Sequence, residues 1–264
     1  MDLQLNAKRA LVTGSTAGIG FAIASTLAAE GAHVVLNGRT QTRVDDAVVR
    51  LRAACPQATV SGVAADLSTA VGVAQLLAAC PEVDVLVNNL GIFAAVPFEA
   101  IDDSEWLRFF EVNVMSGVRL ARHYLPRMKA GNWGRIIFIS SESGVCPPAE
   151  MVHYGMTKSA QLSISRGLAE TCVGTRVTVN AVLPGPTNTE GVGGYLAEMA
   201  KQQNISFAEM EEQLFAAARP TSILKRLIDP AEIASTVAYL CSPLSAATNG
   251  AAIHAEGGVI RSLL

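Results

Sequence analysis

The feature that most constrains the fold of this sequence is a regular alternation of short β-branched runs with longer amphipathic stretches. The short runs have the length and composition of strands that are buried on both faces. They occupy residues 10–13, 33–36, 83–87, 135–139 and 176–179. One intervening stretch repeats apolar side chains at helical spacing, at Val44, Ala47, Val48 and Leu51. The alternation predicts an α/β fold, with helices on both faces of a doubly wound parallel β-sheet.

Helix-end signals fit the same architecture. Gly31 follows residues 28–30 as a glycine just past a helix, and residues 229–232 supply an N-cap aspartate, a proline at the first helical position and an acidic third position. The sequence contains no internal repeat and no interdomain linker. We therefore expect a single Rossmann-like domain over residues 1–264, with its ligand crevice beyond the carboxyl ends of the strands.

The segment from Pro184 to Lys225 is unusually long for a connection between a strand and a helix. Gly191, Gly193 and Gly194 suggest a hinge, and residues 195–218 hold enough Ala, Glu, Met and Leu for one or two helices. We predict that residues 184–225 form a substrate lid. An ordinary surface excursion is the alternative.

Charge and cysteine usage narrow the classes of partner. A net charge of −3 argues against a nucleic acid or an anionic membrane, because either would require clustered positive charge. The five cysteines are scattered and form no C-x-x-C pair, so neither a disulfide framework nor a metal site is expected. The sequence shows no signal peptide and no apolar stretch of membrane-spanning length. We expect a cytoplasmic protein with buried free thiols and a small-molecule partner.

A glycine-rich turn directly follows the first predicted strand and leads into a helix predicted from about residue 19 to 29. Glycines let the backbone approach a pyrophosphate closely, and the free N–H groups of a helix N-terminus attract an anion. The turn therefore predicts a dinucleotide site. Its candidate contacts are Gly14, Ser15, Thr16, Gly18, Ile19 and Gly20. The G-x-x-x-G-x-G spacing alone also fits a purely structural turn.

The residues after the second predicted strand bear on the choice of dinucleotide. An acid at this place selects NAD by bonding both ribose hydroxyls, whereas a base accommodates the 2′-phosphate of NADP. The sequence here is Asn37-Gly38-Arg39-Thr40, without an acid. Arg39 and Thr40 predict a preference for NADP(H) over NAD. The alternative is a solvated arginine at a helix start, and Ala17 in the glycine turn provides no second basic group.

A tyrosine and a lysine stand four residues apart at the start of a predicted helix, at Tyr154 and Lys158. This spacing places both side chains on one helix face. A phenol with a pKa of about 10 is a poor base at neutral pH, but a fixed cation stabilises the phenolate and lowers that pKa. The pair predicts that Tyr154 exchanges a proton with a substrate oxygen during hydride transfer from a nicotinamide. An ordinary surface pair is the alternative.

Two further residues have candidate roles in the chemistry. Ser141 closes the predicted strand 136–139, where its hydroxyl can orient a substrate oxygen. Asn113 lies within a predicted helix and can bind a water that relays protons through Lys158. A helix-bending or satisfied core asparagine is the alternative for Asn113.

Taken together, these motifs resemble the short-chain dehydrogenase/reductase family in order and spacing over almost the whole chain. The matching residues are Gly14, Gly18, Gly20, Asp66, Asn88-Asn89-Leu90-Gly91, Asn113, Ser141, Tyr154, Lys158, Asn180 and Pro184-Gly185. The resemblance implies a catalytic tetrad, with its lysine also bonding the nicotinamide ribose. The tetrad comprises Asn113, Ser141, Tyr154 and Lys158.

The resemblance also implies contacts along the dinucleotide and a homotetramer, in which the helices near 103–129 and 154–172 pack against symmetry mates. Asp66 and Leu67 are expected to flank the adenine, and Thr187 with Thr189 to grip the carboxamide. The remaining expected contacts are Asn89, Gly91, Pro184 and Gly185.

The sequence departs from the family pattern at three places. Leu90 replaces a usual alanine, Ala17 stands in the glycine turn, and residues 254–258 replace a usual valine-aspartate-glycine-glycine turn. The last departure is expected to affect the final strand or a subunit contact. Two neighbours of the motifs have plainer interpretations: His153 as a rim or surface histidine, and Cys146 as a small apolar filler.

The sequence therefore predicts an NADP(H)-dependent enzyme that interconverts a secondary alcohol and a ketone, with Tyr154 as general acid and base. One alternative is a 3-oxoacyl thioester reductase that docks an acidic acyl carrier protein on the basic helix end at Arg127 and Lys129. These cations also simply suit a helix C-terminus. A non-catalytic NADP(H)-binding regulator is the alternative from another class.

Overall fold

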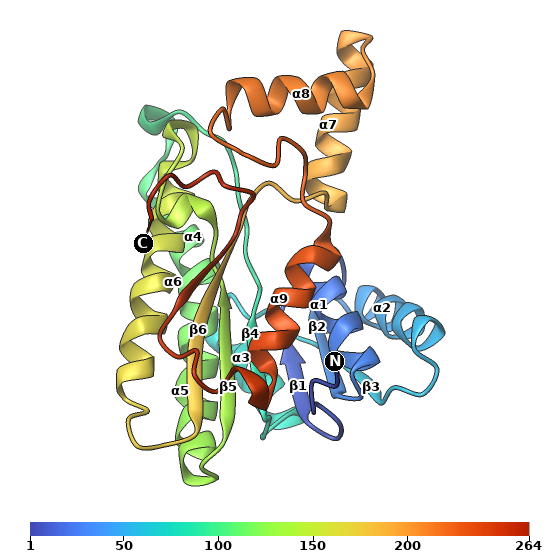
Figure 1. Ribbon diagram of the computed structural model, residues 1–264, viewed down its shortest axis with the longest axis vertical. Helices are drawn as coiled ribbons and strands as arrows, with labels where there is room; N and C mark the ends of the chain where they lie inside the picture. Colours follow the sequence, from blue (N-terminus) through green and yellow to red (C-terminus); the bar gives the residue numbers. More distant parts are fainter. Residues whose placement is uncertain (264) are drawn as a thin grey trace.

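The computed structural model describes residues 1–263, and within them seven strands form one fully parallel sheet (Figure 1). The strand order is β3-β2-β1-β4-β5-β6-β7, so the chain leaves β1 toward one edge and then returns to build the other. The strands are β1 (Arg9–Val12), β2 (His33–Gly38), β3 (Val60–Ala64), β4 (Val85–Asn88), β5 (Gly134–Ile139), β6 (Val177–Pro184) and β7 (Ala252–Ala255). The reversal of direction lies between β1 and β4, which is where a doubly wound sheet opens its ligand crevice.

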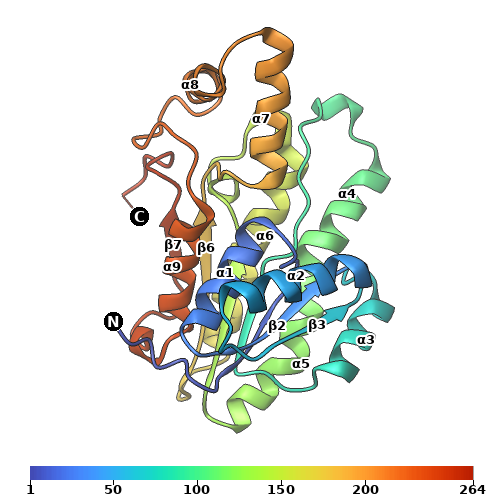
Figure 2. The same ribbon diagram turned by 90° about the vertical axis from the view of Figure 1, so that its right-hand side faces the viewer.

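Helices cover both faces of the sheet (Figure 2). One face packs against α1 (Gly18–Ala29), α2 (Gln41–Ala54) and α9 (Pro230–Cys241), in a core that includes Val12, Ile23 and Ile137. The other face packs against α3 (Ala70–Ala79), α5 (Ser116–Ala130) and α6 (Val152–Glu170), in a core that includes Leu11, Leu120 and Phe138. Successive strand residues point to opposite faces, so strands β1 to β6 contribute to both cores, whereas β7 packs only on the first with Ile253 and Ala255.

The helical layer beside α6 contains an irregular turn. Helix α4 (Asp103–Phe110) continues into a π-helical turn (Glu111–Met115), which leads directly into α5. The predicted helix around Asn113 is thus confirmed, but its hydrogen-bonding pattern widens at that residue. Short 3-10 turns complete the connections at Phe98–Ala100, Glu142–Gly144, Ala149–Met151 and Pro243–Ser245.

Two helices stand apart from the sheet beyond the carboxyl ends of its strands, at the top of Figure 1. They are α7 (Glu190–Gln203) and α8 (Phe207–Ala217), and both lie in the segment for which one or two helices were predicted. They share a small core of Leu196, Ala200, Met210, Phe215 and Leu227. This local core packs the two helices against each other and is separate from the two cores on the faces of the sheet.

The predicted hinge glycines are not in a loop. Gly191, Gly193 and Gly194 lie in the first turns of α7, so that part of the prediction is wrong. Thr189 begins the helix, because its side chain accepts a hydrogen bond from the amide of Val192, and Glu190 adds an acid in the first turn. The cap and the acid outweigh the poor helix propensity of glycine.

Most sequence-based assignments are confirmed. Gly31 has a φ of +84° just past α1, and Asp229 caps α9 in a capping box with Glu232. Strand β3 was not predicted, because its sequence VSGVA carries a serine and a glycine and lies at the edge of the sheet. Pairing with β2 rather than apolar composition makes it a strand.

The central position of β5 leads to a stability prediction. Ile137 is completely buried, so Ile137→Ala should lower the free energy of unfolding by about 2–5 kcal/mol through lost burial and the cavity left behind. Val49 is 66% exposed on α2, and Val49→Ala should change it by no more than about 0.5 kcal/mol. Urea denaturation of both variants measures the two effects. Equal losses would contradict the assignment of Ile137 to the core.

Candidate active site

The glycine turn after β1 is hydrogen-bonded to the side-chain amides of two asparagines. Gly14 and Gly18 have φ values of +60° and +57°, a conformation that favours glycine. The side chain of Asn37 accepts a hydrogen bond from the Gly14 amide at 3.3 Å. On the other side, Asn89 Nδ2 donates to the carbonyls of Thr13 and Gly14 at 2.9 and 3.1 Å. These two asparagines, one in β2 and one just after β4, come from the two strands that flank β1 and fix the shape of the turn.

The start of α1 fits an anionic group. Its N-cap is Ala17, which has no side-chain cap, so the helix N-terminus keeps its positive end available. A Cβ at Gly20 would lie 2.4 Å from Asn89 Nδ2 and 2.6 Å from the Gly14 carbonyl oxygen, which explains the glycine there. The Ser15 hydroxyl instead points into the core and donates to the Val12 carbonyl. Only the backbone of Ser15 therefore faces the turn.

The adenosine side of the site is open. Arg39 and Thr40 are both exposed after β2, and Thr40 precedes α2 without a side-chain capping hydrogen bond. No hydrogen bond or ion pair is found for the Arg39 side chain within residues 1–263. Asp66 is exposed near the end of β3, whereas the Leu67 side chain is completely buried in the core. Any contact of Leu67 with an adenine must therefore come from its backbone.

Asn113 is locked in place by three hydrogen bonds at the π-helical turn. Its Oδ1 accepts from the Ile92 amide at 2.8 Å, and its Nδ2 donates to the Ile92 carbonyl at 2.9 Å and to Thr157 Oγ1 at 3.0 Å. These bonds tie the loop after β4 to α6. The main-chain carbonyl of Asn113 is left to a different partner.

That partner is Gln161, which also contacts Lys158. Gln161 Nε2 donates to the Asn113 carbonyl at 2.6 Å, while Gln161 Oε1 accepts from Lys158 Nζ at 3.3 Å. Lys158 Nζ also donates to the Ile139 carbonyl at 2.8 Å. A Cβ at Gly91 would lie 3.5 Å from both Asn113 Oδ1 and Lys158 Nζ, so Gly91 borders this corner. Burial lowers the pKa of Lys158 to about 7, with a smaller opposing effect of the Glu142 carboxylate.

Tyr154 lies one helical turn before Lys158, whose nitrogen is 5.5 Å from the centre of the phenol ring. Burial raises the pKa of Tyr154, and the negative charge of Glu142 raises it further. The prediction that a fixed cation at Lys158 lowers the pKa of this phenol is therefore wrong, because burial of the ring outweighs any such effect. A hydrogen bond with the Ser141 hydroxyl acts in the opposite direction. Ser141 itself donates to Glu142 Oε2 at 2.6 Å and accepts from the Ser143 amide at 3.1 Å. Three of the four predicted catalytic side chains thus meet at the carboxyl end of β5.

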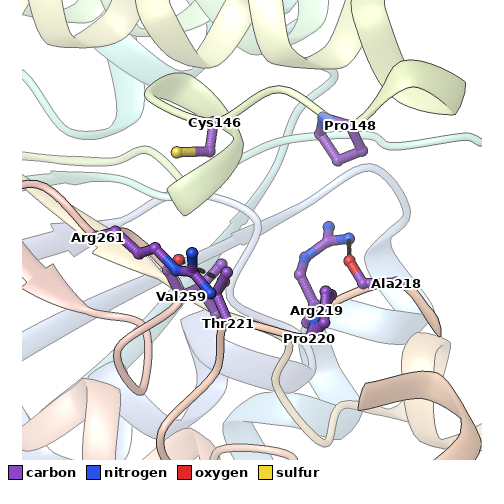
Figure 3. A pocket seen from close by; sticks show the side chains of 8 residues that line it. All are labelled: Cys146, Pro148, Ala218, Arg219, Pro220, Thr221, Val259 and Arg261. Atoms are coloured by element: carbon purple, nitrogen blue, oxygen red, sulfur yellow. Dashed lines mark hydrogen bonds between the residues drawn. The ribbon is translucent and has the colours of Figure 1, made fainter. Parts of the chain in front are cut away.

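A cavity of about 270 Å³ lies next to this cluster (Figure 3). One wall is the loop that carries Cys146 and Pro148, and Arg219 reaches toward it from the segment after α8. Arg219 Nε donates to Glu142 Oε1 at 3.0 Å, which connects the cavity to Ser141 through Glu142. The lining residues are Cys146, Pro148, Ala218, Arg219, Pro220, Thr221, Val259 and Arg261.

Sequence comparison decides the family. A family profile described as short chain dehydrogenase matches residues 8–200 of the chain. The uncharacterized oxidoreductase YvaG of Bacillus subtilis is 52% identical over 263 residues, covering 100% of both chains. This chain belongs to the short-chain dehydrogenase/reductase family.

Two family members whose names state a substrate have lower sequence identity to this chain. The D-beta-hydroxybutyrate dehydrogenase of Cupriavidus necator is 30% identical, with coverage of 96% of this chain and 98% of its own. The L-sorbose reductase of Gluconobacter frateurii, solved in complex with NADPH and L-sorbose, has a TM-score of 0.92 at 32% identity, covering 100% of each chain. The sequence-based prediction of the family and of its fold is confirmed.

The other expected contacts of this short-chain dehydrogenase/reductase lie after β6. Pro184 ends that strand, and the Thr187 hydroxyl donates to the Gly185 carbonyl at 2.8 Å. The Thr189 methyl group would lie 3.3 Å from a Cβ at Gly18, so this threonine borders the glycine turn. The segment that begins the predicted lid therefore passes over the phosphate end of the site.

The departure at residues 254–258 is accommodated locally. Strand β7 still forms and pairs with β6, so the expected effect on the final strand is not seen. The carboxylate of Glu256 accepts hydrogen bonds from the amides of Val259 and Ile260, and its other oxygen lies 3.2 Å from His254 Nδ1. Glu256 thus stabilises the turn after β7 with its own side chain.

Two predictions about neighbouring residues are wrong. His153 is completely buried, with its ring 4.1 Å from that of Phe109 and 6.0 Å from that of Trp106, because α4 packs over this face of α6. Burial lowers its pKa. Cys146 is exposed and lines the cavity rather than filling a core. Cys55 is also only partly buried, so the expectation of buried thiols is confirmed for Cys80, Cys172 and Cys241.

The structure reveals functional candidates that the sequence did not suggest. Gln161 lies three residues after Lys158, so helical spacing would have found it. Glu142 follows Ser141 directly, but nothing in the sequence indicates that its side chain turns inward. Arg219 is 77 residues away from Glu142 and carries no sequence signal at all. Within residues 1–263 no helix is long and apolar enough to cross a bilayer, and no group of three His, Cys, Asp or Glu side chains is arranged to hold a metal.

The crowding at Gly20 generates a prediction about the dinucleotide site. Gly20→Ala should weaken NADPH binding at least about tenfold, because the added methyl group must displace the Asn89 amide that shapes the turn. Gly167→Ala, in α6 where no atom lies within 4 Å, serves as the control and should leave binding unchanged. Fluorescence titration with NADPH measures both. Unchanged binding in Gly20→Ala would show that the turn does not carry the cofactor.

Proposed function

We propose that this protein is an NADP(H)-dependent oxidoreductase that interconverts a secondary alcohol and a ketone, with Tyr154 as the general acid and base. The observation that carries the proposal is the meeting of Tyr154, Ser141 and Lys158 at the carboxyl end of β5, with Asn113 linked to Lys158 through Gln161. The glycine turn after β1 lies at the adjoining strand ends of the same sheet. Such a cluster beside a dinucleotide site suits hydride and proton transfer to one carbonyl group.

When bound, NADPH would supply the hydride for the carbonyl carbon. The glycine turn from Gly14 to Gly20 and the N-terminus of α1 would hold its pyrophosphate, with Thr189 beside them. Asn89 and Gly91 would border the trough, and Lys158 would bind the nicotinamide ribose from its corner beside Gly91. Pro184, Gly185 and Thr187 would line the carboxamide end.

Tyr154 holds the proton that the substrate oxygen receives. Its raised pKa keeps the phenol protonated at neutral pH, which suits a proton donor in carbonyl reduction. In the reverse reaction Lys158 favours the phenolate only in its protonated form, and its lowered pKa of about 7 means that this form is lost as the pH rises above neutral. Ser141 orients the substrate oxygen. The chain of hydrogen bonds from Lys158 through Gln161 to the Asn113 carbonyl occupies the place where a relaying water was expected, so Gln161 fixes the position of the lysine.

The preference for NADP(H) is supported by the exposed side chains after β2. Arg39 and Thr40 are free to meet a 2′-phosphate, and the sequence has no competing acid there. The L-sorbose reductase that shares the fold was solved with NADPH. We infer that Arg39 provides the charge-assisted bonds to the phosphate.

The substrate site is bounded by an aromatic wall and by the predicted lid. The ring of Phe93 lies edge-on to Tyr154 with centroids 6.5 Å apart, and the far edge of Phe93 lies near Gly191 of α7. We propose that residues 184–225 cover a small ketone at this place. The basic helix end does not support the carrier-protein alternative, because Arg127 and Lys129 both donate hydrogen bonds to main-chain carbonyls.

Replacement of the proton donor tests the proposed chemistry. Tyr154→Phe should reduce kcat for NADPH-dependent ketone reduction by about 10²–10⁴-fold, because the phenol hydroxyl is lost while the ring remains. Affinity for NADPH should be unchanged. Steady-state kinetics over a panel of ketones, sugars and keto acids, combined with NADPH titration, provides the readout. Undiminished turnover in Tyr154→Phe would rule out this role.

Replacement of Arg39 tests the cofactor preference. Arg39→Ala should weaken NADPH binding by about ten- to a hundredfold, the amount expected for hydrogen bonds to a charged group, and leave NADH binding unchanged. Arg122→Ala removes an exposed arginine from α5 and controls for the change in net charge. An equal loss for NADPH and NADH would show that Arg39 does not contact the 2′-phosphate.

A further inference from the structure

A buried ion pair joins the catalytic strand end to the segment after α8. Glu142 is 4% exposed and follows the catalytic serine directly. One of its oxygens accepts from Arg219 Nε at 3.0 Å, and the other accepts from Ser141 Oγ at 2.6 Å. The Arg219 side chain is 14% exposed, so both charges are largely removed from water.

Burial of this pair is a poor source of stability, because the desolvation of two charges offsets most of their mutual attraction. An effect on neighbouring groups is a better account of it. Electrostatic interactions are strong where water is excluded, and both charges act on Tyr154. Glu142 hinders ionisation of the phenol, and Arg219 favours it.

The other groups around Tyr154 do not remove the opposing effects of Glu142 and Arg219 on its ionisation. Lys158 lies on the same helix and interacts with the same carboxylate, which favours its charged form. Ser141 is the polar neighbour from the β5 end, and Phe93 is the apolar one from the loop after β4. The acid beside Tyr154 thus comes from the catalytic strand end, and its counter-charge comes from a different part of the chain.

We propose that Glu142 and Arg219 are positioning residues that couple the placement of the segment 184–225 to proton transfer at Tyr154. The inference rests on the proposed role of Tyr154 as acid and base. With the segment seated, Arg219 balances the Glu142 charge, and Glu142 holds the Ser141 hydroxyl in a fixed orientation. With the segment displaced, an uncompensated carboxylate stands beside the phenol and disfavours its ionisation. Alcohol oxidation, which needs the phenolate, therefore depends on a closed segment.

The direction of change in a pH profile tests this coupling. In alcohol oxidation the rate rises as Tyr154 ionises. Glu142→Gln keeps the shape and the hydrogen bond from Ser141 but removes the negative charge, so the profile should move to lower pH by about one unit, a tenfold change in phenolate fraction at fixed pH. Arg219→Ala should move it to higher pH, and Arg219→Lys should fall between Arg219→Ala and the wild type.

Two controls separate the coupling from a general loss of structure. Arg226→Ala removes an arginine directly after the same segment, whose partner Glu232 is exposed, and should leave the profile in place. The double variant Glu142→Gln with Arg219→Ala should lie between the two single variants. Shifts of Glu142→Gln and Arg219→Ala in the same direction, or no shift in either, would overturn the proposal.

A second readout keeps this inference distinct from the proposed function. The ultraviolet absorbance of the phenolate, taken as the difference between each protein and the same protein with Tyr154→Phe, follows the ionisation of Tyr154 without turnover. If no ketone or alcohol is turned over, the proposed function fails while this titration still reports the coupling. Opposite shifts of the titration midpoint in Glu142→Gln and Arg219→Ala support the pair, and coincident midpoints refute it.

Discussion

The parallel direction of all the strands is the constraint on which the rest of this structure depends. Because every strand points the same way, the residues that follow β1, β2, β4, β5 and β6 emerge at one edge of the sheet. Five distant parts of the sequence meet there, represented by the glycine turn, Arg39, Asn89, Ser141 and Thr187. The position of the site follows from the sheet topology, and its side chains determine what it can bind.

The extent to which the sequence predicts this arrangement follows from how local each signal is. The glycine turn, the helix that carries Tyr154 in its first turn and the cap at Asp229 depend on neighbours within a few residues, and all appear as expected. Strand β3 depends on its partner β2, so its own composition conceals it. His153 was misplaced because helical offset indicates only which way a side chain points, not which element covers it.

The candidate site shows the same division. Family motifs point to the residues of the proposed tetrad, yet several partners that set their electrostatics lie outside those motifs. Gln161 is one turn from Lys158 and could be found by spacing, whereas the contact of Arg219 with Glu142 requires the fold of a segment with its own small core. Long-range charge pairs of this kind follow no sequence periodicity from which they could be predicted. They depend on the three-dimensional placement of loops.

The π-helical turn between α4 and α5 has a consequence for how the chain can pack around Asn113. One additional residue in a helix rotates everything after it by about 100° relative to everything before it. Helix α4 can therefore direct Phe109 toward α6 while α5 directs Leu120 and Tyr124 into the core beneath the sheet. A helix of uniform pitch could satisfy one of these two surfaces but not both. The π-helical turn at Asn113 thus rotates α5 relative to α4, so that the two helices can pack on surfaces that one regular helix could not contact together.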